Sequence, residues 1–158
     1  MTIFPNTTPL LAFAALGQFQ LLHQVHGVLR LVEEVVRECE AGGPITVPPL
    51  HTLQWIQIEP SPAIPDPRFF MLDAGERDTI SASLIARADW VLIDERLGRN
   101  LAEYHGLKVV GTLGTLLKAR RMQLIPAFLP AVRNLQDVGF WYHEPLVRRL
   151  AALVGETD

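Results

Sequence analysis

Cysteine is almost absent from this chain of 158 residues, which contains only Cys39. A single thiol excludes an intramolecular disulfide framework and a zinc site built on cysteines, and it fits a reducing, cytoplasmic location. Long apolar runs are also missing, since residues 9–16 fall short of the roughly 20 residues that a membrane-spanning helix needs. Residues 1–8 contain no Lys or Arg, so we expect neither a signal peptide nor a membrane span.

An excess of positive charge is missing as well. The formal net charge is −3, which excludes a generic basic coat for nucleic acid, so any such contact must come from a local basic patch. Hydrophobic residues make up 49% of the chain, which excludes disorder. The length predicts a single domain over residues 1–158.

Three sequence motifs that bind nucleotides or metal ions are absent. The segment 111–115 lacks the spacing and the lysine of a phosphate-binding P-loop, and no G-x-G-x-x-G follows the first predicted strand. The histidines are scattered, and none has the i, i+4 spacing of a helical zinc pair. These absences argue against a P-loop nucleotide site, a dinucleotide-binding fold and a helical zinc site.

Short apolar runs alternate with stretches of helical period along the chain. The predicted strands are residues 2–4, 28–32, 55–58, 90–93 and 109–110. The predicted helices are residues 9–23 (broken or unbroken at Gly17), 33–41, 75–88, 95–105, 113–122, 126–136 and 145–154. This alternation predicts an α/β fold with a parallel sheet, interrupted by a long loop excursion over residues 42–66.

Several residues mark the starts of helices. Asp73 and Glu76 have the D-x-x-E spacing of an N-cap with a reciprocal acid, and Thr112 can cap the helix that follows Gly111. Pro126 and Pro145 are placed to open the last two helices in their first turns.

Polar residues gather where the predicted strands end, and ligands of open α/β sheets bind outside the carboxyl ends of the strands. The set comprises Asn6, Thr7 and Thr8 after the first strand, Glu38 on the helix after the second, Asp73, Glu76 and Asp78 at a helix start, and Asp94 and Glu95 after the fourth strand. Converging carboxylates repel one another, and a hard cation such as Mg²⁺ or Mn²⁺ offsets that repulsion. The pattern therefore indicates a metal-dependent nuclease.

Structural roles compete with this interpretation. Asp73 and Glu76 can serve as a helix cap alone, and Asp94 with Glu95 can simply open the next helix. Glu38 follows two other acids on its helix, as a solvated surface residue would. Asp78 is out of phase with Asp73 and Glu76, so only one or two of these three can face a shared site.

Basic and aromatic residues offer a surface for a nucleic acid. Arg96 and Arg99 flank Asp94, and a cluster of cations lies near the end of the next helix, formed by Lys118, Arg120 and Arg121. The cluster is either a phosphate-positioning rim for single-stranded RNA or a complement to the helix dipole. Trp141, Tyr142 and His143 are either stacking partners for bases or core residues.

Five blocks of sequence carry a resemblance to a known family. They are Asn6-Thr7-Thr8-Pro9-Leu10, L-D-A-G-E at 72–76, L-I-D-E-R-L-G-R at 92–99, G-L-K-V-V-G-T-L-G at 106–114 and L-K-A at 117–119. Together they resemble the PIN-domain superfamily, in its prokaryotic branch of uncharacterised members predicted to bind nucleic acid, over nearly the whole chain. The resemblance implies a three-layer α/β/α sandwich with a mainly parallel central sheet. It also implies a Mg²⁺- or Mn²⁺-dependent endoribonuclease acting on single-stranded RNA, often the toxin of a VapC-type toxin–antitoxin pair, with a small antitoxin protein and a second copy of the chain as partners.

The resemblance also implies the site residues. The family's four acidic positions fall on Asn6, on Glu38 with Glu33 as a weaker choice, on Glu76 or Asp78, and on Asp94 with Glu95 beside it. Glu76 and Asp94 would then be the principal metal ligands, Glu38 an outer or bridging ligand, and Asn6 a neutral ligand or an orienter of water. Thr7, Thr8, Arg96, Arg99 and Lys118 would contact the substrate.

Asn6 departs from the family pattern, in which an aspartate occupies this position. Its amide oxygen can still face a cation, but it brings no negative charge, and ligand charge tunes the affinity for hard cations. We therefore expect weaker metal binding. A catalytically weakened or inactive module that binds RNA or a protein partner is the alternative function.

Overall fold

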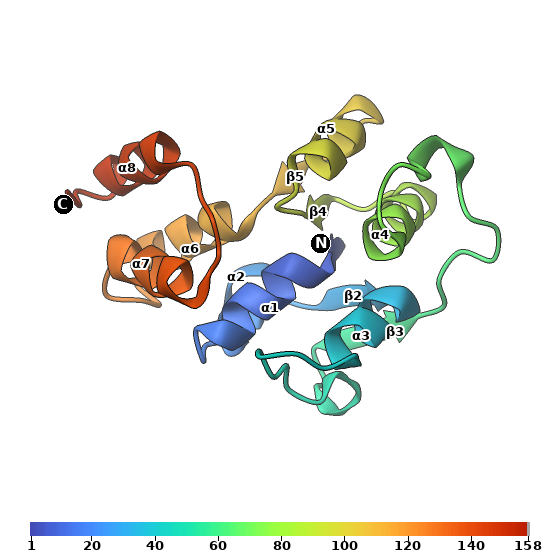
Figure 1. Ribbon diagram of the computed structural model, residues 1–158, viewed down its shortest axis with the longest axis horizontal. Coiled ribbons are helices and arrows are strands. Elements are labelled where there is room, and N and C mark those ends of the chain that lie inside the picture. The colour runs from blue at the N-terminus through green and yellow to red at the C-terminus, as the bar shows by residue number, and fades with distance from the viewer. Residues whose placement is uncertain (158) are drawn as a thin grey trace.

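Five parallel strands form the centre of the fold in the computed structural model, which describes residues 1–157 (Figure 1). They are β1 (Ile3–Pro5), β2 (Leu29–Val32), β3 (Ile56–Glu59), β4 (Trp90–Leu92) and β5 (Val109–Val110). Central strand residues such as Ile3, Leu31 and Val91 are fully buried, as expected for strands covered on both faces. The predicted strands and their parallel arrangement are confirmed.

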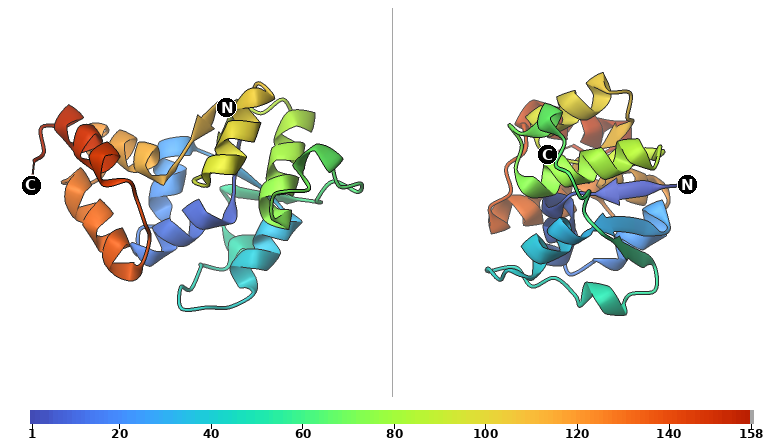
Figure 2. Two further views of the ribbon diagram at one scale, coloured as in Figure 1. Left: turned by 45° about the horizontal axis from the view of Figure 1, so that its top comes forward. Right: turned by 90° about the vertical axis from the view of Figure 1, so that its right-hand side faces the viewer.

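Helices form the outer layers of the sandwich. They are α1 (Thr7–Ala15), α2 (Gln20–His26), α3 (Glu33–Glu40), α4 (Ala74–Ile85), α5 (Arg96–Tyr104), α6 (Thr112–Arg121), α7 (Phe128–Val138) and α8 (Glu144–Leu153), with short 3₁₀ turns η1 (Leu50–Thr52) and η2 (Pro67–Phe69). In the right-hand view of Figure 2, α4 and α5 lie above β1 and α3 lies below β1. The predicted three-layer α/β/α architecture is therefore confirmed.

The strand order brings two polar segments to one edge of the sheet. The order is β3-β2-β1-β4-β5, so β1 lies between β2 and β4 and the chain runs outward from it in both directions. Pro5 pairs with Leu92, and the Asn6 N–H continues this ladder by donating to the Leu92 carbonyl at 2.9 Å. Asn6 and Asp94 therefore leave adjacent strands at the crevice where the strand order reverses, which is the usual ligand position in open α/β sheets.

The structure confirms some of the predicted helix starts and differs from others. The Asp73 carboxylate accepts from the Glu76 N–H at 2.9 Å, so the predicted N-cap of α4 is confirmed. The prediction that Thr112 caps α6 is wrong, because Gly111 occupies the N-cap position and the Thr112 hydroxyl donates to Asp94 instead. Pro145 lies in the first turn of α8 as predicted.

Two boundaries in the helical layers also differ from the prediction. Pro126 precedes α7 instead of opening it, because the helix begins at Phe128. The first predicted helix is broken around Gly17, whose positive φ of +67° favours glycine, and α1 begins at Thr7, two residues before the predicted start at residue 9.

Three helices build one end of the molecule. Figure 1 shows α6, α7 and α8 gathered at the end that carries the C-terminus. The Glu156 carboxylate accepts from the Phe128 and Leu129 N–H groups, each at 2.8 Å, and so ties the C-terminal segment to the start of α7. Within residues 1–157, no helix has both the length and the apolar character that crossing a membrane requires.

Candidate active site

The candidate site lies at the carboxyl edge of the sheet, where loops and helix starts from five parts of the chain meet. Asn6 follows β1 and Asp94 follows β4, while Glu38 projects from α3 and Glu76 from the first turn of α4. The N-terminal ends of α1, α4, α5 and α6 also reach this edge, because each follows a strand end or contacts one of these side chains. Helix N-termini carry partial positive charge, which favours carboxylates and phosphates here.

Asn6 is buried, and one of its polar side-chain atoms makes no hydrogen bond to the described residues. The residue is 3% exposed, and its Oδ1 has no hydrogen-bond partner among the described residues. A buried acceptor without a partner costs about 1–3 kcal/mol. Such an atom at the sheet edge is suited to receive a water or a cation.

Glu38 connects two helix starts. Its carboxylate accepts from the Thr7 hydroxyl at the beginning of α1 and from the Gly75 N–H at the beginning of α4, the latter at 2.9 Å. Burial raises the pKa of Glu38, the Thr7 hydrogen bond lowers it, and the nearby charge of Asp73 raises it. Glu38 is thus a half-buried group of the site, not a solvated surface residue.

Glu76 is a buried acid of the site with a strongly raised pKa. It is 4% exposed, and its Oε1 lacks a hydrogen-bond partner in the part of the chain that the structure describes. Burial, followed by the charges of Asp73, Glu95 and Glu38, raises the pKa of Glu76 to about 7. Nothing in residues 1–157 bonds this oxygen, so it does not supply the reciprocal half of the predicted capping box. It packs instead against Gly98 of α5.

Asp94 is held at the start of α6. Its two oxygens accept from the Thr112 N–H at 2.7 Å and from the Thr112 hydroxyl at 2.5 Å. Burial raises the pKa of Asp94, while the Thr112 hydrogen bonds and then the charge of Arg99 lower it. Arg99 is itself fixed, because its Nη1 donates to the Ile93 carbonyl at 2.9 Å.

Three glycines pack directly against the three carboxylates. A Cβ on Gly75 would lie 2.4 Å from Glu38 Oε2, and one on Gly98 would lie 2.3 Å from Glu76 Oε1. At Gly111 a Cβ would meet Arg99 Nη1 at 2.7 Å and Asp94 Oδ1 at 2.8 Å. The sequence blocks contain these glycines, but their pairing with individual acids depends on contacts between helices that no local pattern reveals.

The remaining predicted site residues occupy varied positions. Asp78 is buried and paired with Arg77 Nε at 3.0 Å, and it is not among the charges that act on Glu76. Glu95 is exposed, yet its charge acts on Glu76. Three residues predicted to contact the substrate make none of the hydrogen bonds described above. Thr8 is half-buried in the first turn of α1, and Arg96 is exposed as the first residue of α5. Lys118 is exposed further along α6, where its charge lowers the pKa of His26 after the larger effect of burial.

Tyr142 reaches the site from the linker between α7 and α8. Its hydroxyl is buried near Thr112 without a well-aligned hydrogen bond to any described residue. Burial and then the charge of Asp94 raise the pKa of Tyr142. Spacing in the sequence gave no sign that this residue would contact the Asp94 region, because 48 positions separate the two.

The donor atoms of the site fit a hard divalent cation. Within residues 1–157, no three His, Cys, Asp or Glu side chains lie close enough together, as they stand, to hold a metal ion. Hydrogen bonds hold Glu38 and Asp94 in their present orientations, whereas the buried oxygens of Asn6 and Glu76 have no partner in that range. Oxygen donors are what Mg²⁺ and Mn²⁺ prefer, so the chemistry of these side chains fits such an ion.

Comparison with known proteins identifies the family. The family model described as a PIN domain matches residues 2–156, which is nearly the whole chain. No curated protein and no solved structure matches the chain. PIN domains are nuclease-type domains that bind nucleic acid and in general depend on divalent metal. The sequence resemblance is therefore confirmed, and the chain belongs to the PIN-domain family.

Proposed function

We propose that this protein is an endoribonuclease that depends on Mg²⁺ or Mn²⁺ and cleaves single-stranded RNA. The observation that carries the proposal is a pair of buried oxygens, Asn6 Oδ1 and Glu76 Oε1, which have no hydrogen-bond partner within residues 1–157 and lie at the edge that also holds Glu38 and Asp94. Burial, followed by the charges of neighbouring acids, raises the pKa of Glu76 to about 7, and a bound cation would offset this unfavourable charge.

Each side chain has a role in this proposal. Glu76 and Asp94 would hold the cation, with Glu38 as an outer or bridging ligand and Asn6 as a neutral ligand or an orienter of water. A bound Mg²⁺ or Mn²⁺ supplies a lowered pKa for a coordinated water and neutralises charge on the phosphodiester. Thr8 and Arg96, at the starts of α1 and α5, would position the scissile phosphate together with the helix N-termini.

Cleavage of a mixed panel of single-stranded RNAs tests the proposal. We expect cleavage with Mn²⁺ or Mg²⁺ that stops on addition of a chelator. Asp94→Asn and Glu76→Gln should each lower the rate by at least about 100-fold, in line with loss of a metal ligand or its outer partner.

A matched control distinguishes the effect of losing a site carboxylate from the effect of losing a carboxylate elsewhere on the protein. Glu103 is an exposed carboxylate on α5, so Glu103→Gln should cleave like the wild type. Retention of full activity in both Asp94→Asn and Glu76→Gln would refute the assigned site, and absence of cleavage over the whole panel would refute the nuclease.

Asn6 supports a second candidate function. An amide in place of an acid leaves the site one negative charge short, which favours a module that binds RNA or a protein partner with little or no cleavage. RNA binding that persists without a divalent ion, in protein that cleaves nothing, would favour this function over the nuclease.

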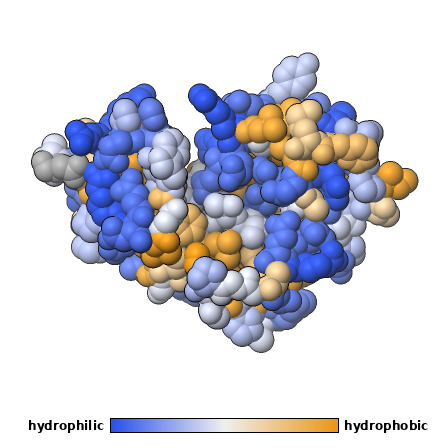
Figure 3. All heavy atoms as spheres, viewed as in Figure 1, coloured by the Kyte–Doolittle hydropathy of each residue, from blue (hydrophilic) through white to orange (hydrophobic). Residues whose placement is uncertain are grey.

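The proposal includes a homodimer and a small antitoxin protein as partners. Large apolar side chains are exposed on α5 and in the segment before α4, including Phe70 (62%), Met71 (66%) and Leu97 (48%). Figure 3 shows apolar side chains gathered over this part of the surface. Light scattering after size exclusion should give the mass of two chains for the wild type, and Leu97→Glu should shift it toward the mass of one chain. A wild type with the mass of a single chain would refute the dimer.

A further inference from the structure

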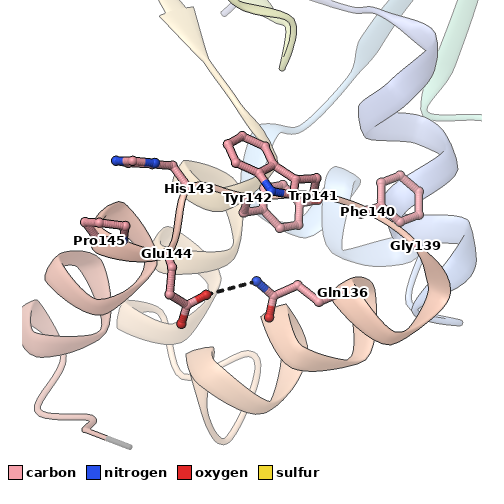
Figure 4. A pocket seen from close by; sticks show the side chains of 8 residues that line it. All are labelled: Gln136, Gly139, Phe140, Trp141, Tyr142, His143, Glu144 and Pro145. Atoms are coloured by element: carbon pink, nitrogen blue, oxygen red, sulfur yellow. Dashed lines mark hydrogen bonds between the residues drawn. The ribbon is translucent and has the colours of Figure 1, made fainter.

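The linker between α7 and α8 exposes an aromatic side chain beside the candidate site. Trp141 is 81% exposed, and the adjacent ring of His143 has its centroid 6.3 Å away, tilted by 48°. Figure 4 shows Trp141, Tyr142 and His143 along this linker, close to the hydrogen bond between Gln136 and Glu144. Exposed aromatic faces are the groups on which the bases of a single strand stack.

Hydrogen bonds fix the linker at both of its ends. Gly139 has a φ of +118° and closes α7, and the N–H of Phe140 donates to the Leu135 carbonyl at 3.0 Å. At the other end, the Glu144 carboxylate binds Arg133 at 2.6 Å. The aromatic residues are therefore presented in a defined orientation, so that little conformational freedom would be lost on binding.

Tyr142 places this linker next to the carboxylates. Its buried hydroxyl lies near Thr112, the residue that binds Asp94 through both its N–H and its hydroxyl. Trp141 is the next residue along the chain, with a Cα about 3.8 Å from that of Tyr142. The linker that carries Trp141 therefore lies beside the Asp94 region of the site.

We propose that Trp141 forms a nucleobase subsite, in which the indole stacks on a base of the single-stranded RNA whose phosphate lies at Asp94. The inference rests on the proposed function and adds the recognition of bases to it. A shallow, open surface pocket of about 520 Å³, lined by residues between Gln136 and Pro145, adjoins the indole. Figure 3 shows the surface hollowed between this end of the molecule and the sheet.

Charge and surroundings favour a base over a protein partner. Glu144, at the end of the linker, forms ion pairs with Arg133 at 2.6 Å and Arg148 at 3.7 Å. Because these cations balance its charge, the carboxylate should not repel the phosphates of a bound strand. Phe70 and Met71, two exposed apolar side chains suited to a protein interface, lie in the segment before α4, at the end of Figure 1 opposite the linker. Because every base has an aromatic face, the subsite should bind without strong sequence preference.

The test compares RNA with the same strand lacking its bases. Affinities for a single-stranded oligonucleotide and for an abasic strand of equal length are measured for the wild type, Trp141→Ala and Trp141→Phe. Trp141→Ala should bind the base-bearing strand between about 5-fold and about 150-fold more weakly, the range that corresponds to loss of one stacked base. Trp141→Phe should keep most of the affinity, and the abasic strand should bind all three proteins alike.

Tyr104 provides the matched control, since this aromatic residue is 84% exposed on α5. Tyr104→Ala should bind both strands like the wild type. Equal affinity of the wild type and Trp141→Ala for the base-bearing strand would overturn the subsite, as would an equal loss for the abasic strand, or a change of oligomeric mass in Trp141→Ala without a change in affinity.

Cleavage kinetics keep this inference separable from the nuclease proposal. If the protein cleaves RNA, Trp141→Ala should raise KM about as much as it weakens binding, with kcat retained. Cleavage with an unchanged KM would overturn the subsite and leave the nuclease intact. A base-dependent loss of binding in a protein that cleaves nothing would support the subsite and refute the nuclease.

Discussion

The ionised form of the Glu76 side chain is unfavourable in the folded protein, because the carboxylate is buried and lies near other negative charges. Its carboxylate is buried between α4 and Gly98 of α5, faces the charges of other acids, and has an oxygen without a partner in residues 1–157. The folded protein therefore holds a proton on Glu76 up to a pKa of about 7, against an ordinary value of 4.5.

This residue predicts a dependence of stability on pH. Since the folded state binds the Glu76 proton more tightly than the unfolded state, the free energy of unfolding falls as pH rises from about 4.5 through about 7. Glu76→Gln removes this titration, so the variant should gain stability relative to the wild type by on the order of 2 kcal/mol across that interval. Urea unfolding with a chelator present, at about pH 4.5 and about pH 8, measures the difference, and a difference that does not change with pH would contradict the assignment.

Asn6 is the second informative residue. Asn6→Asp adds a charge next to an existing cluster of acids, so without metal the variant should be less stable than the wild type by about 1–3 kcal/mol. With saturating Mn²⁺ the order should reverse, because the added carboxylate binds the cation, and cleavage should become faster. Calorimetry of Mn²⁺ binding checks the affinity directly, and an unchanged affinity would remove Asn6 from the site.

At the scale of the elements, the site depends on how closely helix starts approach the acids. Gly75, Gly98 and Gly111 lie in the first turns or at the N-caps of α4, α5 and α6, and each contacts a different carboxylate. A side chain at any of them would push an acid away from the edge of the sheet.

Gly111→Ala tests this arrangement against a matched change in the same region. The added methyl group would collide with Asp94 and Arg99, so we expect metal affinity and RNA cleavage to fall by at least about 10-fold. Gly114→Ala, on α6, meets only Val110 at 3.1 Å and should leave both properties within about 3-fold. Equal effects of the two substitutions would indicate a general disturbance of α6 and contradict the proposed contact.

The start of α7 gives a prediction about stability alone. Ala127 at its N-cap offers no side-chain acceptor, and Glu156 supplies the acceptor for two N–H groups from far along the chain. Glu156→Ala should therefore lower the free energy of unfolding by about 1–2 kcal/mol, with RNA cleavage retained. Chemical denaturation measures this, and Glu103→Gln, which alters an exposed acid, should show no such loss.

At the scale of the whole molecule, the fold was largely predictable because strand and helix periods are local. Apolar runs and helical periods placed the five strands in sequence, and the helical segments between them left a parallel sheet as the natural arrangement. Boundaries failed where a distant contact replaces a local signal. Thr112 bonds Asp94 instead of its own helix, and Glu156 caps α7 in place of Pro126 or Ala127.

The site was predictable only in its location. The edge of the sheet follows from the strand order, and the acids follow from their positions after strands and at helix starts. Spacing alone could not show that Glu38 bonds Gly75, that Glu76 packs against Gly98, or that Tyr142 returns to Asp94, because each is a contact between separate elements. Their pKa values depend on burial and on neighbouring charges, which only the folded chain defines.

Crystals soaked in Mn²⁺, with anomalous scattering recorded at the manganese edge, show directly whether these carboxylates hold a cation. We expect an anomalous peak at the carboxyl edge of the sheet with oxygen atoms of Glu76 and Asp94 at about 2.0–2.6 Å, and no peak there in Asp94→Asn crystals. Full occupancy of manganese elsewhere on the protein, with Glu38, Glu76 and Asp94 unmoved and without metal, would contradict it.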